Sequence, residues 1–199
     1  FMYKILDVSN FLKVLDATCG SGGFLVKAMA NMIREAGGMQ SDTAAEIKSS
    51  HLYGIEFDRE IYALACANML IHKDGKTNLE QMDARTESAC EWMKSKPITK
   101  VLMNPPYENK YGCMTIVENV LDNVPAHTQC AFILPDKKLE KASKAQIKRI
   151  LKNHRLRKVI KLPEDLFFGI GITTSIFVFE AGVGQDGKEF FACYMESDG

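Results

Sequence analysis

An asparagine, two prolines and a tyrosine occupy positions 104–107, directly after the hydrophobic residues 101–103. Asn104 has a side-chain oxygen and Pro105 a backbone carbonyl, so the pair can accept hydrogen bonds from both N–H groups of an amine. Because proline fixes its own φ and restricts the residue before it, Pro105 and Pro106 hold these acceptors in a narrow range of positions. The tetrad therefore predicts a site that activates an amine nitrogen, although an ordinary Asn-Pro turn at a strand end is the simpler interpretation.

The stretch DATCGSGG at 16–23 is rich in glycine. Its glycines allow the backbone to turn sharply and to approach a ligand closely at the start of a helix. The stretch lacks the G-K-[ST] ending of a phosphate-binding loop and the third spaced glycine of the dinucleotide fingerprint. Taken alone, it also fits a tight turn between a strand and a helix.

Two acidic residues follow later hydrophobic runs. Glu56 can accept hydrogen bonds from both hydroxyls of a ribose. Asp83 can accept a hydrogen bond from the exocyclic amine of an adenine, although a helix cap or a turn residue is an alternative for it. Phe57 can lie against the face of the same ring. These residues together predict an adenosine-like ligand that needs no phosphate anchor.

These candidate residues fall at the ends of expected strands over 13–18, 51–57, 78–84 and 100–106. We expect helices over 24–37, 59–75, 87–96, 115–124 and 137–154, and later strands over 130–135, 157–163, 173–180 and 188–196. The alternation of strands and helices predicts an α/β fold with a doubly wound, mostly parallel sheet, and the closing strands predict an antiparallel C-terminal edge. Because ligands bind beyond the carboxyl ends of such strands, the candidate residues should meet in one crevice.

The chain has 199 residues, of which 46% are hydrophobic and 25% charged, so one globular domain with its own core is expected over 1–199. No apolar run approaches the roughly 20 residues that span a bilayer, and no signal-peptide pattern begins the chain. The first residue is Phe1 rather than Met, which favours a piece of a longer protein.

The six cysteines are scattered and include no C-x-x-C pair, so neither a metal site nor a disulfide framework is expected. The net charge is zero, but the segment 136–161 holds eleven Lys or Arg residues against two acidic ones. This segment is equally compatible with a solvated helix face and with a surface that faces nucleic-acid phosphates.

The combination of VLDATCGSGG and NPPY resembles the S-adenosylmethionine-dependent amino-methyltransferases, and most closely the adenine-specific DNA methyltransferases among type I restriction–modification M subunits. Ala17 stands where the first motif of that family usually has proline. The segment 156–180 is similar to a late motif of the same group, and the resemblance extends from about Val14 to Glu180. It implies a Rossmann-like methyltransferase fold, S-adenosylmethionine as cofactor and methylation of adenine N6 in DNA.

The resemblance also implies roles for particular residues. The catalytic and target-binding residues would be Asn104, Pro105, Pro106 and Tyr107, with Phe167 packing against the target base. The cofactor would contact Asp16, Ala17, Thr18, Gly20, Ser21, Gly22, Gly23, Glu56, Phe57, Asp83 and Ala84. Tyr107 can stack on a base that has rotated out of its duplex, as chemistry on a paired base requires.

The residues themselves leave other functions open. Glutamine methyltransferases that act on release factors also carry N-P-P-Y, and RNA amine methyltransferases are a related alternative. A cofactor-binding subunit without catalytic activity is a third. No Pro-Cys pair occurs, whereas methylation of cytosine at C5 needs a cysteine nucleophile. The late motif and the basic segment favour double-stranded DNA with a flipped adenine.

Three parts that the family usually has are missing from these 199 residues. No Thr-Pro segment precedes the glycine-rich stretch, where the family completes its cofactor pocket, and the family's N-terminal helical part is absent. No target-recognition domain is present either. The resemblance therefore implies a separate specificity subunit, a restriction subunit, no membrane association and a cytoplasmic location in a bacterium or archaeon.

Overall fold

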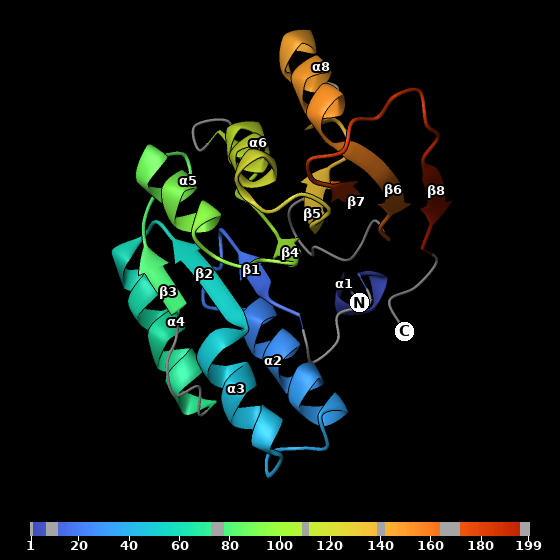
Figure 1. The fold of residues 1–199 in the computed structure, drawn as a ribbon. Helices are drawn as coiled ribbons and strands as arrows, with labels where there is room; N and C mark the ends of the chain where they lie inside the picture. Colours follow the sequence, from blue (N-terminus) through green and yellow to red (C-terminus); the bar gives the residue numbers. More distant parts are fainter. Residues whose placement is uncertain are drawn as a thin grey trace.

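The computed structural model describes residues 2–6, 12–72, 78–108, 112–138, 142–163 and 172–195. A sheet with the strand order β3-β2-β1-β4-β5-β7-β6-β8 forms the centre of this part of the chain (Figure 1). Its strands are β1 (Val14–Asp16), β2 (Leu52–Glu56), β3 (Asn78–Gln81), β4 (Lys100–Met103), β5 (Gln129–Pro135), β6 (Arg155–Lys161), β7 (Thr174–Glu180) and β8 (Phe191–Tyr194). The helices are α1 (Met2–Ile5), α2 (Gly23–Glu35), α3 (Asp42–Ser50), α4 (Arg59–Ile71), α5 (Glu87–Lys94), α6 (Cys113–Asn123) and α8 (Lys144–Asn153).

The first five strands pair in parallel, and β7 then inserts antiparallel between β5 and β6. This arrangement confirms the predicted α/β fold with an antiparallel C-terminal edge. The outermost strand differs in one respect, because β8 runs parallel to β6. Since β6 has the same direction as β5, the carboxyl ends of all these strands except β7 lie on one side of the sheet.

Helices cover both faces of the sheet. Figure 1 shows α2, α3 and α4 on one face and α5 and α6 on the other. The central strands bury side chains toward both layers: Leu15 and Val101 belong to the core cluster on the α5–α6 side, and Val14 and Leu102 to the other. Burial on both faces explains why these strands are continuously hydrophobic in the sequence rather than alternating.

Three helices differ from the expected elements, and the first is the short α1, which was not predicted. The helix α3 was not predicted, because it is short and buries only Ala44 and Ile47. The predicted helix over 137–154 is not continuous, because residues 142 and 143 are not helical and 139–141 lie outside the described residues. The helix α8 begins at Lys144, where the hydroxyl of Ser143 accepts a hydrogen bond from the backbone N–H of Gln146 at 3.1 Å. None of the described helices combines the length and apolarity that crossing a bilayer requires.

Candidate active site

The carboxyl ends of β1, β2, β3 and β4 surround a cavity of about 350 Å³. Eight of the residues predicted to form a site line it: Ala17, Thr18, Glu56, Phe57, Asp83, Ala84, Asn104 and Pro106. Five further lining residues were not predicted: Asp58, Ile61, Met82, Arg85 and Ile116. The predicted convergence of four strand ends is therefore present in the fold, and the cavity lies within the size range of small-molecule sites.

The glycine-rich stretch turns tightly between β1 and α2. Gly20 and Gly22 have φ angles of 56° and 83°, a conformation that residues with a Cβ atom rarely adopt. The backbone N–H of Gly22 donates to the carbonyl of Cys19 at 2.8 Å, and Gly22 itself is the N-cap of α2 without any side-chain cap. The turn therefore directs the N-terminus of α2 toward the same end of the sheet as the cavity.

The Asp16 carboxyl lies behind this turn and is almost completely buried, with 2% of the residue exposed. Its Oδ1 accepts a hydrogen bond from the backbone N–H of Thr18 at 3.1 Å. Burial raises the pKa of Asp16 to about 7, the Thr18 N–H opposes this rise, and the nearby Glu56 carboxylate adds to it. Ionised Asp16 is therefore costly in the free protein, and a cationic ligand in the cavity would favour its charged form.

Replacing Asp16 by Asn is expected to stabilise the ligand-free protein at pH 8 by up to about 4 kcal/mol. In the unfolded chain the Asp16 carboxyl ionises near pH 4, whereas in the folded protein it keeps its proton to about pH 7. Folded stability therefore falls as the pH rises from about 4 to about 7, and the variant escapes this loss. Urea denaturation at several pH values measures the difference, and equal stability of the two proteins at pH 8 would contradict the argument.

The Glu56 carboxylate connects two segments at the cavity. Its Oε2 accepts the backbone N–H of Gly20 at 2.9 Å, and its Oε1 accepts the backbone N–H of Asp58 at 2.9 Å. Asp58 in turn caps α4 by accepting the backbone N–H groups of Glu60 and Ile61. Each oxygen of Glu56 keeps a second lone pair, so the carboxylate can also accept from a ligand's hydroxyl groups.

The Asp83 carboxylate follows β3 and is paired with Arg85. The shortest of their contacts joins Nη2 of Arg85 to Oδ2 of Asp83 at 2.6 Å. This pairing holds the pKa of Asp83 below its usual value despite partial burial. The N-cap of α5 is Thr86, whose hydroxyl accepts the backbone N–H of Ala89, so the helix-cap interpretation of Asp83 is wrong. Asp83 instead occupies a turn in which its carbonyl accepts the N–H of Thr86.

The tetrad at 104–107 leaves the end of β4 with Asn104 exposed and Pro105 buried. The hydroxyl of Tyr107 donates to Oδ1 of Asn104 at 2.6 Å. The Tyr107 ring packs partly buried against the core cluster on the α2 side. Nζ of Lys138, just after β5, donates to the backbone carbonyl of Tyr107 at 2.5 Å. The structure thus gives Tyr107 a clear contact with Asn104, which the sequence did not suggest.

The family resemblance implies methyl transfer at Asn104, and on that expectation replacing Tyr107 by Phe should reduce the transfer rate roughly fivefold. The variant keeps the ring but loses the hydroxyl that fixes the orientation of the Asn104 carboxamide. Single-turnover methyl transfer measures this rate. Tyr62→Phe is the matched control, because the Tyr62 hydroxyl donates to the carbonyl of Leu79 and does not line the cavity. Equal rates for Tyr107→Phe and the wild type would show that the hydroxyl does not position Asn104.

The cavity suits a ligand that is partly apolar and partly cationic. Phe57, Ile61 and Ile116 offer apolar surface, while Glu56 and Asp83 contribute carboxylates. The side-chain hydroxyl of Thr18 is buried and has no hydrogen-bond partner among the residues that the structure describes. An unpaired buried hydroxyl at a cavity wall indicates a place where a polar ligand group would be stabilised. The residues present therefore fit the adenosine and the charged portion of S-adenosylmethionine.

The remaining predicted residues lie outside the cavity lining. Those that the structure describes are Asp16, Gly20, Ser21, Gly22, Gly23, Pro105 and Tyr107. The carbonyl of Ser21 accepts a hydrogen bond from Nδ2 of Asn68 in α4 at 2.9 Å, which attaches the glycine-rich turn to that helix. Phe167 lies outside the described residues.

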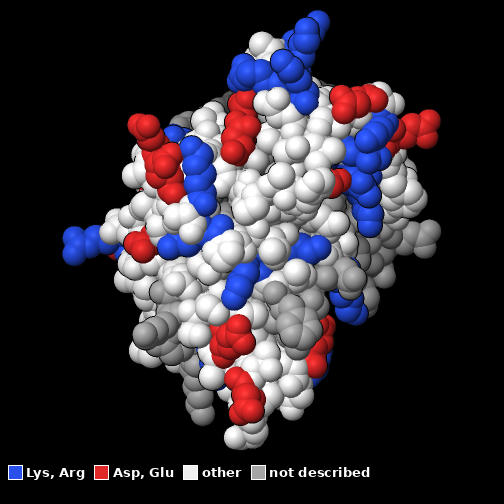
Figure 2. All heavy atoms as spheres, in the orientation of Figure 1, with Lys and Arg blue, Asp and Glu red and all other residues white. Residues whose placement is uncertain are grey.

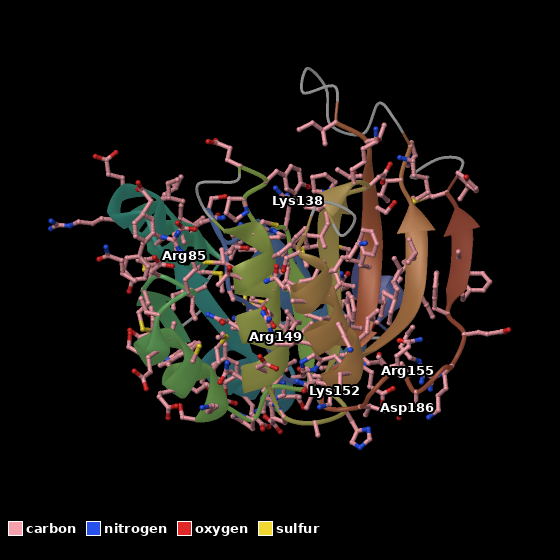
Figure 3. All side chains as sticks on the ribbon, turned by 90° about the horizontal axis from the view of Figure 1, so that it is seen from above. Arg85, Lys138, Arg149, Lys152, Arg155 and Asp186 are labelled. Atoms are coloured by element: carbon pink, nitrogen blue, oxygen red, sulfur yellow. The ribbon has the colours of Figure 1, made fainter. Side chains whose placement is uncertain are left out.

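The basic segment 136–161 does not form one uniform surface. Figure 2 shows Lys and Arg side chains gathered over α8, with acidic side chains directly beside them. Arg149 pairs with Glu118 at 2.9 Å, Arg157 with Glu180 at 3.0 Å, and Lys161 with Asp136. In Figure 3, Lys138 lies near the carboxyl end of β5, whereas Lys152 and Arg155 lie toward the opposite end of the sheet. Much of this charge is therefore neutralised locally or lies far from the cavity.

Comparison with known proteins decides the family. The family model described as N-6 DNA Methylase matches residues 1–129 and 114–193. The chain belongs to this family. The type II restriction enzyme and methyltransferase RM.BcgI of Heyndrickxia coagulans is 32% identical over all of this chain, which covers 32% of that protein. The type I EcoEI methylase subunit of Escherichia coli is 23% identical over 92% of this chain, which covers 40% of that subunit.

Solved structures support the fold of this N-6 DNA methylase family member. The M protein of the type I restriction enzyme EcoKI superposes with a TM-score of 0.76 at 19% identity, over 90% of this chain and 41% of that one. A Listeria monocytogenes protein named as a class I S-adenosylmethionine-dependent methyltransferase gives 0.74 at 19% identity, over 98% of this chain and 62% of that one. The fold is thus that of these methyltransferases, and the chain spans about a third to two fifths of the curated relatives' length.

Proposed function

We propose that residues 1–199 form the catalytic domain of an enzyme that methylates N6 of adenine in DNA, with S-adenosylmethionine as the methyl donor. The observation that carries the proposal is the position of Asn104 on the wall of the same cavity as Glu56 and Asp83. An acceptor for a target amine and the acceptors for an adenosine-like ligand therefore share one cavity. Membership of the N-6 DNA methylase family supports the choice of reaction.

The proposed cofactor site divides into a polar and an apolar part. Glu56 accepts hydrogen bonds from the ribose hydroxyls, and Asp83 accepts one from the adenine amine. Phe57 and Ala84 enclose the ring, and the turn at 16–23 faces the methionine end. When bound, S-adenosylmethionine supplies an activated methyl group on a positively charged sulfur. The half-exposed ring of Phe57, with 59% of the residue accessible, has room to pack against an added aromatic ring.

The target amine is held by two acceptors. Oδ1 of Asn104 accepts one N–H and the carbonyl of Pro105 accepts the other, which favours a pyramidal nitrogen with a free lone pair. Oδ1 already accepts the Tyr107 hydroxyl, but its second lone pair remains available for the amine. Acceptors that are aligned before the reaction lower its barrier through positioning and electrostatics. No strong general base is required, because the alkylated ammonium product loses its proton readily to water.

The relatives suggest how such a domain is used. One is a methylase subunit of a type I restriction enzyme, and another combines restriction enzyme and methyltransferase in one protein. We propose that this chain serves likewise as the modification component of a restriction–modification system on double-stranded DNA. Target specificity would come from a specificity subunit or a further domain, and a restriction subunit would be an additional partner. Phe167 and Tyr107 remain the proposed contacts of the flipped adenine.

The test is transfer of a tritiated methyl group from S-adenosylmethionine by the protein together with its natural partner subunits. Unmethylated DNA, RNA and release factor are offered separately, and the labelled product is hydrolysed and identified. We expect label in N6-methyladenine from DNA alone. Label in N4-methylcytosine, in RNA or in glutamine would contradict adenine in DNA as the substrate and identify the actual one. Cofactor binding without any transfer would indicate a catalytically inactive subunit.

A further inference from the structure

The pairing of Arg85 with Asp83 is unusually complete for two side chains at the wall of a cavity. Oδ1 of Asp83 accepts the backbone N–H of Arg85 at 2.9 Å and its Nε at 2.8 Å. Oδ2 accepts Nη2 at 2.6 Å, and Nε also approaches this oxygen at 3.1 Å. The planar guanidinium thus donates side-on to both carboxylate oxygens through Nε and Nη2, and the backbone N–H of Arg85 donates to Oδ1 from a second direction.

This pattern limits what else Asp83 can bind. A carboxylate has about four lone-pair positions, two on each oxygen. The backbone N–H and Nε of Arg85 take both positions on Oδ1, and Nη2 takes one on Oδ2. The longer contact from Nε to Oδ2 uses the same single hydrogen that Nε donates to Oδ1, so it does not count as a further position. A single position on Oδ2 is left. The carboxylate can therefore accept from one further donor, in a direction that Arg85 fixes.

The Arg85 side chain lies between Asp83 and the start of α6. A Cβ atom added to Gly112, the N-cap of α6, would lie 3.5 Å from Cδ of Arg85, so the aliphatic stem of Arg85 passes close to this glycine. The Arg85 side chain remains 34% exposed, and the residue lines the cavity together with Asp83. Figure 3 shows Arg85 on the α5 and β3 side of the molecule, far from the basic residues at the end of α8. Arg85 therefore belongs to the cavity wall and to the pair with Asp83 rather than to the basic segment.

We infer that Arg85 is a positioning residue that orients Asp83 so that its one remaining acceptor position receives the exocyclic amine of the cofactor's adenine. The inference rests on the proposed function, because it assigns the cavity to an adenosine-containing ligand. The arrangement discriminates by chemistry: a purine that carries an N–H donor at position 6 fills the last position on Oδ2. A purine without this donor leaves it unfilled. Arg85 also keeps the pKa of Asp83 low, so the acceptor stays charged.

Calorimetry with two ligands tests the inference on the full chain. One ligand is S-adenosylhomocysteine, and the other is the same thioether with unsubstituted purine in place of adenine. For the wild type we expect roughly tenfold or greater preference for the adenine compound, the contribution of one hydrogen bond to a charged acceptor. In Arg85→Gln the preference should fall below about threefold, because the carboxylate is no longer held in one orientation. Arg149→Gln, which also breaks an Arg–carboxylate pair, is the matched control and should keep the wild-type preference.

The outcomes separate the inference from the proposed function. A general loss of structure in Arg85→Gln weakens both ligands by the same factor and leaves their ratio unchanged, and an unchanged ratio overturns the inference. If the ratio is unchanged in Arg85→Gln but the wild type still prefers the adenine compound, the inference fails while the proposed cofactor site stands. A wild type that binds neither compound overturns the proposed cofactor site and the inference together. Partial recovery of the preference in Arg85→Lys supports the inference, since lysine restores the charge without the side-on geometry.

Discussion

Replacing Asn104 by Ala is expected to slow methyl transfer at least about 100-fold, while the affinity for the cofactor stays within about twofold. The variant loses the side-chain oxygen that we propose as the acceptor of one N–H of the target amine. That interaction strengthens as the nitrogen becomes pyramidal, so its loss raises the barrier more than it weakens binding. Because the Asn104 side chain is exposed, its truncation leaves no cavity in the core. Single-turnover transfer at saturating cofactor measures the rate, and calorimetry measures the affinity.

Two comparisons make the Asn104 result specific. Asn104→Asp keeps an oxygen acceptor at the same distance from the backbone, so it should retain more activity than Asn104→Ala. Asn78→Ala removes an asparagine that donates to the carbonyl of Ser49, away from the cavity, and should leave the rate unchanged. Normal turnover by Asn104→Ala would remove the tetrad from the mechanism, and with it the central argument for amine methylation.

The positions of the site residues followed from the sequence because each lies at or just after the end of a predicted strand; β2 and β4 are hydrophobic, whereas β3 buries only Leu79. Glu56 ends β2, while Asp83 and Asn104 follow β3 and β4. Parallel pairing of β2 and β4 with β1, and of β3 with β2, brings these ends together. Hydrophobic runs in the sequence indicate where each strand lies and ends. The alternation of strands with helices indicates that the strands are parallel. The family resemblance added roles to these positions but was not needed to predict that they meet.

Other features could not be predicted, because they depend on side-chain conformation or on contacts between distant segments. Ile116 reaches the cavity from α6, and nothing in its neighbourhood distinguishes it from an ordinary core residue. The hydrogen bond from Tyr107 to Asn104 depends on how the chain turns after two prolines. Arg85 lies two residues after Asp83, a spacing that is too common to indicate a pair. Only Asp58 had a detectable signal, as a helix N-cap close after Glu56.

Replacing Glu56 by Ala is expected to weaken cofactor binding by about 100-fold or more. The variant loses the proposed hydrogen bonds to the ribose, each made by a charged acceptor. It also frees the backbone N–H groups of Gly20 and Asp58, which Glu56 now holds together. The glycine-rich turn and the start of α4 are then no longer fixed relative to each other, so the cofactor must order them when it binds. Calorimetry with S-adenosylhomocysteine measures the affinity.

Glu56→Gln separates these two contributions. The amide oxygen can still accept one backbone N–H, but the amide nitrogen would face the other N–H as a second donor. Its affinity should therefore lie between those of the wild type and Glu56→Ala. Glu60→Ala is the matched control, because Glu60 is exposed in the first turn of α4 and does not line the cavity. If Glu56→Ala bound the cofactor within about threefold of the wild type, other residues would have to hold the ribose. That result would contradict the assignment of the cavity at the end of β2 to the cofactor.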